Sequence, residues 1–202
     1  MERFGSVIMG DRGVGNTLVV VDMQPFFTAS ARPGLVDRIA ARVRRHHECG
    51  DAVVVLETLV EGLDHRVENS THADILNSAG FGPDPVGGTA TPDGHAILTY
   101  KEQDDGSHAV IKAVRLLAPR LEPHKFIVCG VNTDACVLDT ARGLLRSVPN
   151  SSVVLPVWCC ACQSDRKREE DKGIHASALL IEVFCKDWQG RATRVWGADE
   201  IG

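Results

Sequence analysis

The sequence predicts an α/β fold, a three-layer α/β/α sandwich around a six-stranded, mostly parallel, doubly wound sheet. Short apolar runs rich in β-branched residues recur along the chain, and segments with helical periodicity separate them. Strands that alternate with helices form right-handed βαβ units, which place parallel strands in one sheet. A chain of 202 residues that is 44% hydrophobic can bury one such sheet beneath helices on both faces. We therefore expect residues 1–202 to form a single domain, with residues 1–16 as a flexible leader.

Six segments are predicted as strands. The first five are almost continuously apolar instead of alternating, which is typical of parallel strands that are covered on both faces. In chain order the six segments are Leu18–Val21, Ala52–Leu56, Ala96–Thr99, Phe126–Cys129, Val153–Val157 and Thr193–Trp196.

Longer segments with the apolar spacing of amphipathic helices connect these strands. They are Leu35–His47, His108–Leu117, Asp134–Arg146 and Arg166–Phe184. The connection from Glu61 to His95 differs, because it is rich in Gly, Pro, Asp and His and holds only a short predicted helix, Ala73–Ala79. A loop of this length in a compact domain usually shapes a binding site, so we expect it to contribute to specificity.

Composition and charge exclude several classes of function. The formal net charge is −5 and the Lys and Arg residues form no basic stripe, so we expect no nucleic-acid partner. No apolar run approaches the roughly 20 residues of a membrane-spanning helix, and the first residues lack the apolar stretch of a signal peptide. We therefore expect a cytoplasmic protein with no membrane partner. In that compartment the seven cysteines would remain thiols, and one of them can be reactive.

Polar side chains that follow the apolar strands are the candidates for a site. Asp22 follows the first strand, Lys101 the third, and Cys136 lies a short turn after the fourth. Ligand crevices of open α/β sheets lie at the carboxyl ends of the strands, where residues distant in sequence meet. Each residue alone is more often structural, as a cap, a solvated amine or core filler. Their joint placement favours one shared site.

An acid, an ammonium and a thiol can perform nucleophilic catalysis together. A thiol with a pKa of about 8.5 is mostly protonated at neutral pH, and a helix N-terminus or a nearby ammonium lowers that pKa. We expect both influences at Cys136, because a helix is predicted to begin near Thr133. The carboxylate of Asp22 can accept the thiol proton and pass it to a leaving group.

Two segments resemble a known family. Leu-Val-Val-Val-Asp-Met-Gln-Pro-Phe-Phe, from Leu18 to Phe27, resembles the first strand of the isochorismatase-like (cysteine hydrolase) family, in which Asp-x-Gln follows a valine-rich strand. Cys-Gly-Val-Asn-Thr-Asp-Ala-Cys-Val-Leu-Asp-Thr-Ala, from Cys129 to Ala141, resembles its nucleophile segment, Gly-x-x-Thr-Asp-x-Cys-Val followed by Thr-Ala. Lys101 fits the catalytic lysine of the family. The resemblance extends from about Thr17 to Val195 and is to the amidohydrolase branch.

The resemblance implies a mechanism and a set of roles. Cys136 would attack a carbonyl and form a thioester, Asp22 would shuttle the proton, and Lys101 would stabilise charge, until water hydrolyses the thioester. It also implies a cis peptide between Val131 and Asn132, so that the backbone N–H groups of Asn132 and Cys136 form an oxyanion hole. The implied substrate is a small molecule with a carboxamide or ureido C–N bond, and no cofactor is implied. Family members commonly associate, so we expect a homo-oligomer.

Side chains near the predicted strand ends are expected to line the substrate pocket. They are Gln24, Phe27, Tyr100 and Trp158, with Phe26 beside them. Large aromatic residues at such positions suit an apolar pocket with a few polar groups, although they also occur there as core residues.

The chain departs from the family pattern after the second predicted strand. Nicotinamidases carry an Asp-x-His metal motif there, whereas this chain reads Leu-Glu-Thr-Leu-Val-Glu from Leu56 to Glu61. Glu57, His65 and His72 could form an improvised site, but scattered histidines in a polar loop are more often solvated, so we expect no metal. Cys159, Cys160 and Cys162 lack the Cys-x2-Cys spacing of structural zinc sites and are interpreted as buried thiols. The charged run that begins at Arg166 is interpreted as the solvated start of the last helix.

Two other functions remain open from the sequence. One is hydrolysis of a vinyl ether such as that of isochorismate, a branch that need not use a cysteine. The other is a catalytically silent relative that serves as a binding or assembly module. The presence of Asp22, Lys101 and Cys136 together favours the amidohydrolase.

Overall fold

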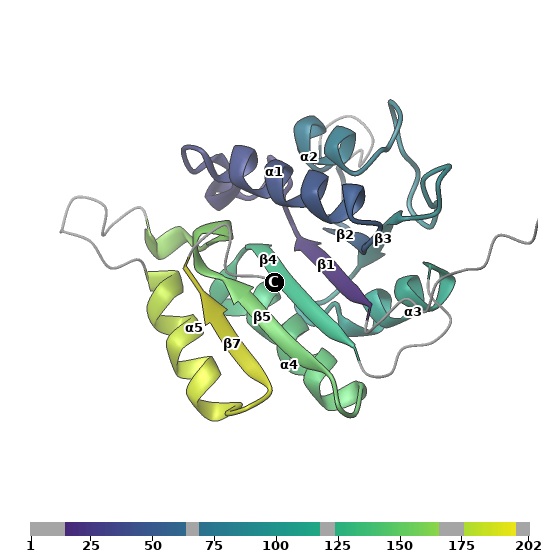
Figure 1. Cartoon of the computed structure of the whole chain (residues 1–202). Helices are drawn as coiled ribbons and strands as arrows, with labels where there is room; N and C mark the ends of the chain where they lie inside the picture. Colours follow the sequence, from purple (N-terminus) through teal and green to yellow (C-terminus); the bar gives the residue numbers. More distant parts are fainter. Residues whose placement is uncertain (1–14, 64–68, 118–123, 166–175, 197–202) are drawn as a thin grey trace, which may run out of the picture.

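A parallel sheet lies at the centre of the protein, with its strands in the order β3-β2-β1-β4-β5-β7 (Figure 1). The computed structural model describes residues 15–63, 69–117, 124–165 and 176–196. The strands of the sheet are β1 Asn16–Val21, β2 Ala52–Thr58, β3 Ala96–Lys101, β4 Lys125–Val131, β5 Ser152–Pro156, β6 Cys160–Ala161 and β7 Ala192–Val195. The predicted class, a mostly parallel α/β sheet, is confirmed, and every pairing between these strands is parallel.

The sheet has seven strands instead of the predicted six. The additional strand is β6, whose residues Cys160 and Ala161 pair with Gly130 and Val131 of β4. A strand of two residues is too short to leave a pattern in the sequence, and here it lies within the cysteine-rich segment that was interpreted only as buried thiols. β1 also begins at Asn16, inside the predicted leader, whereas residues 1–14 lie outside the described part of the chain.

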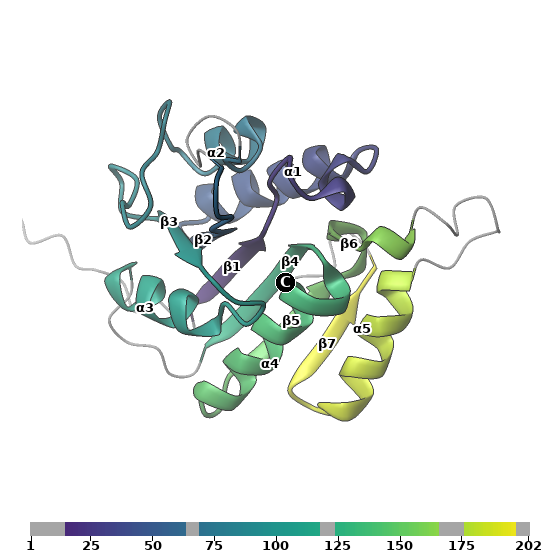
Figure 2. The same cartoon turned by 180° about the vertical axis from the view of Figure 1, so that it is seen from behind.

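Helices cover both faces of the sheet, as a doubly wound fold requires (Figures 1 and 2). One face carries α1 and α2, and the other carries α3, α4 and α5. Their bounds are α1 Leu35–Glu48, α2 Ala73–Ser78, α3 Ser107–Leu117, α4 Leu138–Ser147 and α5 Ala176–Asp187. None of the described helices is long and apolar enough to cross a membrane.

One helix, α4, begins later than predicted. The segment Thr133–Val137 forms a π-helical turn, and the regular α4 begins only at Leu138. Such wide turns are rare and often occur at functional sites. The last helix is described from Ala176, and the charged run from Arg166 lies outside the described residues.

The chain reverses its direction of travel across the sheet between β1 and β4. β1, β2 and β3 follow one another toward one edge, and β4 then returns to the other side of β1. The residues of β1 from Leu18 to Val21 are fully buried, because strands flank them and helices cover both faces. A reversal of this kind leaves a crevice at the carboxyl ends of the two adjoining strands, which is where ligands bind in such sheets.

Candidate active site

The candidate site lies at the carboxyl ends of β1 and β4, on either side of the reversal. Val21, the last residue of β1, is in register with Leu56 on β2 and Gly130 on β4. Gly130 has a φ of 130°, and a Cβ atom there would lie 2.0 Å from the carbonyl oxygen of Val21. Only glycine permits this close approach. It brings the chain that leaves β4 directly beside the end of β1.

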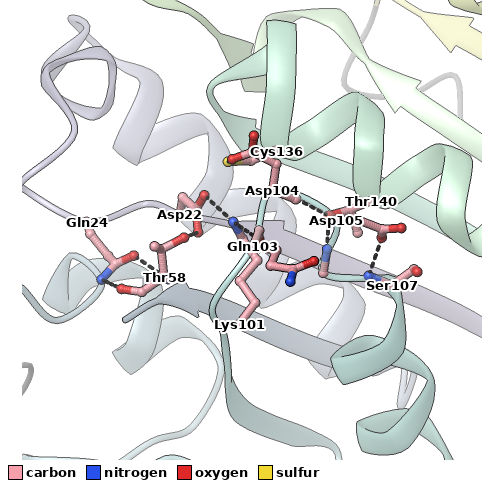
Figure 3. Close-up of polar contacts among 11 residues, drawn as sticks. Asp22, Gln24, Thr58, Lys101, Gln103, Asp104, Asp105, Ser107, Cys136 and Thr140 are labelled. Atoms are coloured by element: carbon pink, nitrogen blue, oxygen red, sulfur yellow. Dashed lines mark hydrogen bonds and ion pairs between the residues drawn. The ribbon is translucent and has the colours of Figure 1, made fainter. Parts of the chain in front are cut away.

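Asp22 and Lys101 form a buried ion pair at this edge (Figure 3). Lys101 Nζ lies 3.0 Å from Asp22 Oδ2, and their side chains are 3% and 0% exposed. The Thr58 hydroxyl, at the end of β2, donates a hydrogen bond to Asp22 Oδ1 over 2.9 Å. Lys101 also donates to the backbone oxygen of Gln103 over 3.1 Å. Both oxygens of the carboxylate are thus engaged, which fixes its orientation.

Cys136 lies in the π-helical turn that follows β4, and its thiol is buried. The pKa of the Cys136 thiol is raised to about 12, chiefly by burial and further by the nearby negative charge of Asp22. The charge and hydrogen bond of Lys101 act in the opposite direction. The expected lowering of this pKa is therefore not found, because burial and the carboxylate outweigh the ammonium. The resting thiol is protonated at neutral pH and needs a base at the moment of attack.

Asp104 is a site residue that the sequence did not single out. The Cys136 thiol donates a hydrogen bond to Asp104 Oδ1, with 3.4 Å between Sγ and the oxygen (Figure 3). Thr140 of α4 holds this segment, since its hydroxyl donates to the backbone oxygen of Asp104 over 3.4 Å and accepts from the Gly106 N–H over 3.0 Å. Asp104 follows Lys101 by three residues, and this proximity in sequence was the only available signal.

A second buried network supports the turn that contains Cys136. Asp165 accepts hydrogen bonds from the Ser177 hydroxyl over 2.7 Å and from the Cys162 N–H over 2.9 Å. The Ser177 hydroxyl also lies 3.0 Å from that of Thr133 in the π-helical turn. Burial by itself would raise the pKa of Asp165. These hydrogen bonds and the Arg32 guanidinium outweigh burial, so the pKa lies below its usual value. The network ties the start of α5 to the nucleophile segment.

The side chains of the site open into a cleft of about 490 Å³. Of the predicted pocket residues, Phe27 lines this cleft together with its neighbour Phe26. The other residues that line it are Thr58, Lys101, Glu102, Gln103, Asp104, Asn132, Asp134, Ala135, Cys136 and Gln163.

Gln24, Tyr100 and Trp158 are not among the residues that line the cleft. Gln24 is fully buried and joins two loops, because its amide exchanges hydrogen bonds with the backbone of Thr58 and donates to the Asn69 oxygen. Side chains alternate along a strand, so Tyr100 points away from the face that Lys101 uses, and its hydroxyl accepts from the Gly87 N–H over 3.2 Å. The exposed ring of Trp158 contacts the ring of Trp196 edge to face.

Asn132, predicted for the oxyanion hole, also lines the cleft. Its φ of 59° is in the left-handed region, as is the φ of 54° of Asp22. Non-glycine residues in this conformation cost energy and cluster at functional sites. The oxyanion role of the Asn132 and Cys136 N–H groups stays a prediction.

Two residues of the improvised metal site, Glu57 and His72, make hydrogen bonds to other parts of the chain. Glu57 accepts a hydrogen bond from the Thr71 N–H over 2.6 Å, and the His72 ring lies 3.0 Å from the Ser30 hydroxyl. His65 lies outside the described residues. Within the part of the chain that the structure describes, no three His, Cys, Asp or Glu side chains form a group that could hold a metal ion.

No protein-family model and no curated protein sequence matches the chain. The similarity to known proteins therefore lies in the fold alone.

Solved structures do match the fold. A Leishmania donovani protein assigned as a MAR1 ribonuclease superposes with a TM-score of 0.62 at 17% identity, covering 91% of this chain and 79% of that one. N-carbamoylsarcosine amidase from Thermoplasma acidophilum has a TM-score of 0.59 at 17% identity, covering 94% and 100%. A nicotinamidase from Staphylococcus aureus has a TM-score of 0.59 at 16% identity, covering 89% and 99%. Isochorismatase family proteins match as well. The chain has an isochorismatase-like fold.

Proposed function

We propose that this chain, with its isochorismatase-like fold, is a cysteine hydrolase that cleaves the C–N bond of a small carboxamide or ureido group. The observation that carries the proposal is the buried ion pair of Asp22 and Lys101 beside the Cys136 thiol, at the floor of a cleft. Burying an ion pair carries a large desolvation cost, and a catalytic role for the pair would offset that cost. Two of the solved structures with this fold are amidases by name, which agrees with the proposal.

The mechanism follows from the positions of these groups. As Cys136 Sγ attacks the carbonyl carbon, Asp22 accepts the thiol proton, and the negative charge moves to the carbonyl oxygen. Asp22 then returns the proton to the nitrogen, the C–N bond breaks, and ammonia or an amine leaves a thioester on Cys136. Water attacks the thioester with Asp22 as base, which releases the acid and restores the thiol. Lys101 holds the Asp22 carboxylate in place through their ion pair, and its positive charge opposes the build-up of negative charge during attack.

The charge of the cleft disfavours two other functions. Hydrolysis of isochorismate would bring a dicarboxylate to a cleft that is lined by Glu102, Asp104 and Asp134, with Lys101 as the only basic residue among the described residues around it. A ribonuclease substrate, suggested by the name of one structural neighbour, would bring phosphates to the same place. Like charges at such distances repel, so both substrates fit this cleft worse than an amide does.

The test is a panel of small amides and ureides, with released ammonia as the readout. We expect Cys136→Ala to abolish hydrolysis, whereas Cys185→Ala, which removes a half-buried thiol on α5, leaves the rate unchanged. Intact-mass analysis after rapid acid quenching should detect an acyl group on Cys136. Hydrolysis that survives Cys136→Ala would refute the proposed nucleophile. A chain that binds panel members without cleaving any of them would be a binding module instead.

A further inference from the structure

We propose that the cleft selects a substrate with a cationic group, an ammonium or a guanidinium, beside the scissile amide. This inference rests on the proposed function for the reaction, but its evidence is the charge and the aromatic lining of the cleft. It names a substrate class that the amidase assignment alone leaves open.

The first observation is the uncompensated negative charge of the cleft. Asp22 and Lys101 neutralise each other, and both are buried. Glu102, Asp104 and Asp134 are exposed on the cleft wall, and no ion pair joins them to a cation in the part of the chain that the structure describes. Lys101, already paired, is the only basic residue among the described lining residues. The described lining residues, with the buried Asp22–Lys101 pair neutral, therefore present a net charge of about −3 to a ligand, which attracts cations and repels carboxylates.

The second observation is independent of these acids and concerns two aromatic rings. Phe26 and Phe27 line the same cleft, and their rings lie edge to face with centroids 5.2 Å apart. Phe26 is 51% exposed, so its ring is available to a ligand. The face of an aromatic ring attracts an ammonium or guanidinium, and this attraction grows when the cation is shielded from water. Carboxylates together with aromatic faces bind organic cations better than they bind neutral or anionic groups.

Asp104 couples recognition to chemistry. Its carboxylate lies at the cleft wall and accepts the hydrogen bond of the resting Cys136 thiol. Its backbone is held by Thr140, so the carboxylate stays near the nucleophile. A cationic group that pairs with Asp104 competes for the lone pairs that hold the thiol. Binding of such a substrate thus frees the thiol proton for Asp22, at the moment when the carbonyl carbon lies within reach of Sγ.

The experiment uses three amides of equal length: 4-aminobutanamide, which is cationic, pentanamide, which is neutral, and glutaramate, which is anionic. Binding is measured by calorimetry on the Cys136→Ala chain, so that the result does not depend on turnover or on the thiol. Three charges at partly exposed positions favour the cationic amide over pentanamide by about tenfold in affinity. Because exposed charges are screened, this preference should fall as NaCl is raised from roughly 0.05 M to 0.5 M.

Charge variants test which residues recognise the cation. In the Cys136→Ala chain, Asp104→Asn should reduce the cationic preference by about fivefold, and Asp134→Asn should reduce it in the same direction. Glu48→Gln is the matched control, because Glu48 is an exposed acid at the C-terminal end of α1. α1 runs antiparallel to the strands, so this residue lies near their amino ends, away from the cleft. Its loss should leave the preference unchanged.

The outcomes separate this inference from the proposed function. Equal binding of the three amides, tighter binding of glutaramate, or no binding of any of them would overturn the inference, even if the native chain hydrolyses other amides. A cationic preference without hydrolysis would support the inference and count against the hydrolase. An equal loss of preference in Glu48→Gln and Asp104→Asn would also overturn it, because the effect would then come from net charge and not from the cleft.

Discussion

Replacement of Asp22 by Asn should make Cys136 more reactive toward an alkylating agent while it abolishes hydrolysis. The pKa of this thiol is raised to about 12, chiefly by burial and further by the charge of Asp22. At pH 8 the thiolate population is then about one in ten thousand, against about a quarter for an unperturbed thiol. Asp22→Asn removes the negative charge, and loss of a nearby like charge favours the thiolate.

The size of the effect follows from general values for thiols. A neighbouring charge shifts a pKa by roughly one to three pH units, and each unit of fall raises the thiolate population tenfold. A less basic thiolate is also less nucleophilic, so the labelling rate rises by only about threefold for each unit. We therefore expect Cys136 to be alkylated about three to thirty times faster in Asp22→Asn than in the native chain.

The assay is iodoacetamide labelling at pH 8, followed by peptide mapping, with the exposed Cys49 as the internal reference. Asp22→Asn also leaves Lys101 buried without its partner, so partial unfolding has to be distinguished from activation. Unfolding would label the fully buried Cys129 and Cys160 as well, whereas activation labels Cys136 alone. Unchanged or slower labelling of Cys136, with Cys129 and Cys160 protected, would show that Asp22 does not control the thiol.

The remaining predictions concern stability. Lys101→Met should lower the free energy of unfolding by about 3–5 kcal/mol in urea denaturation, because it leaves the Asp22 charge buried and unpaired. Lys186→Met, which breaks an exposed ion pair, should leave the free energy of unfolding almost unchanged. Burial lowers the pKa of His124 to about 4, so the unfolded chain binds a proton there between about pH 6.5 and 4 while the folded chain does not. Stability should fall by about 3 kcal/mol on acidification across that range, and His124→Gln should remove this part of the slope while the exposed His108→Gln retains it. Gly130→Ala should prevent folding or lower the melting temperature severely, because the new Cβ would collide with Val21. Gly82→Ala is the control, because the space around Gly82 is open, and it should leave the melting temperature nearly unchanged. Equal melting temperatures of the two variants would contradict the register of β1 and β4.

Local patterns predicted most elements of the fold. The continuous apolar runs identified six strands because parallel strands are buried on both faces, and each run then overlaps an observed strand. The same reasoning placed Asp22, Lys101 and the segment of Cys136 at one edge, since parallel strands end together. It missed β6 and the π-helical turn, because a pairing of two residues and a shift of one hydrogen bond leave no period to detect.

Other properties of the site depended on contacts between segments that are distant in sequence. The sequence predicts a lowered pKa for Cys136, and this prediction is wrong, because burial and the charge of Asp22 arise only when β1, β3 and β4 assemble. The positions of Gln24, Tyr100 and Trp158 were decided by side-chain direction and by partners on other loops.

The sequence by itself determined six of the seven described strands and which reactive side chains lie at their carboxyl ends, because burial patterns and strand ends are local features of a chain. Only the tertiary structure decided how those side chains interact. The protonated state of the Cys136 thiol, its contact with Asp104 and the negative charge of the cleft depend on distances of a few ångströms between separate segments. Electrostatic and hydrogen-bonding energies vary steeply over such distances, and they are set by the packing of the whole domain.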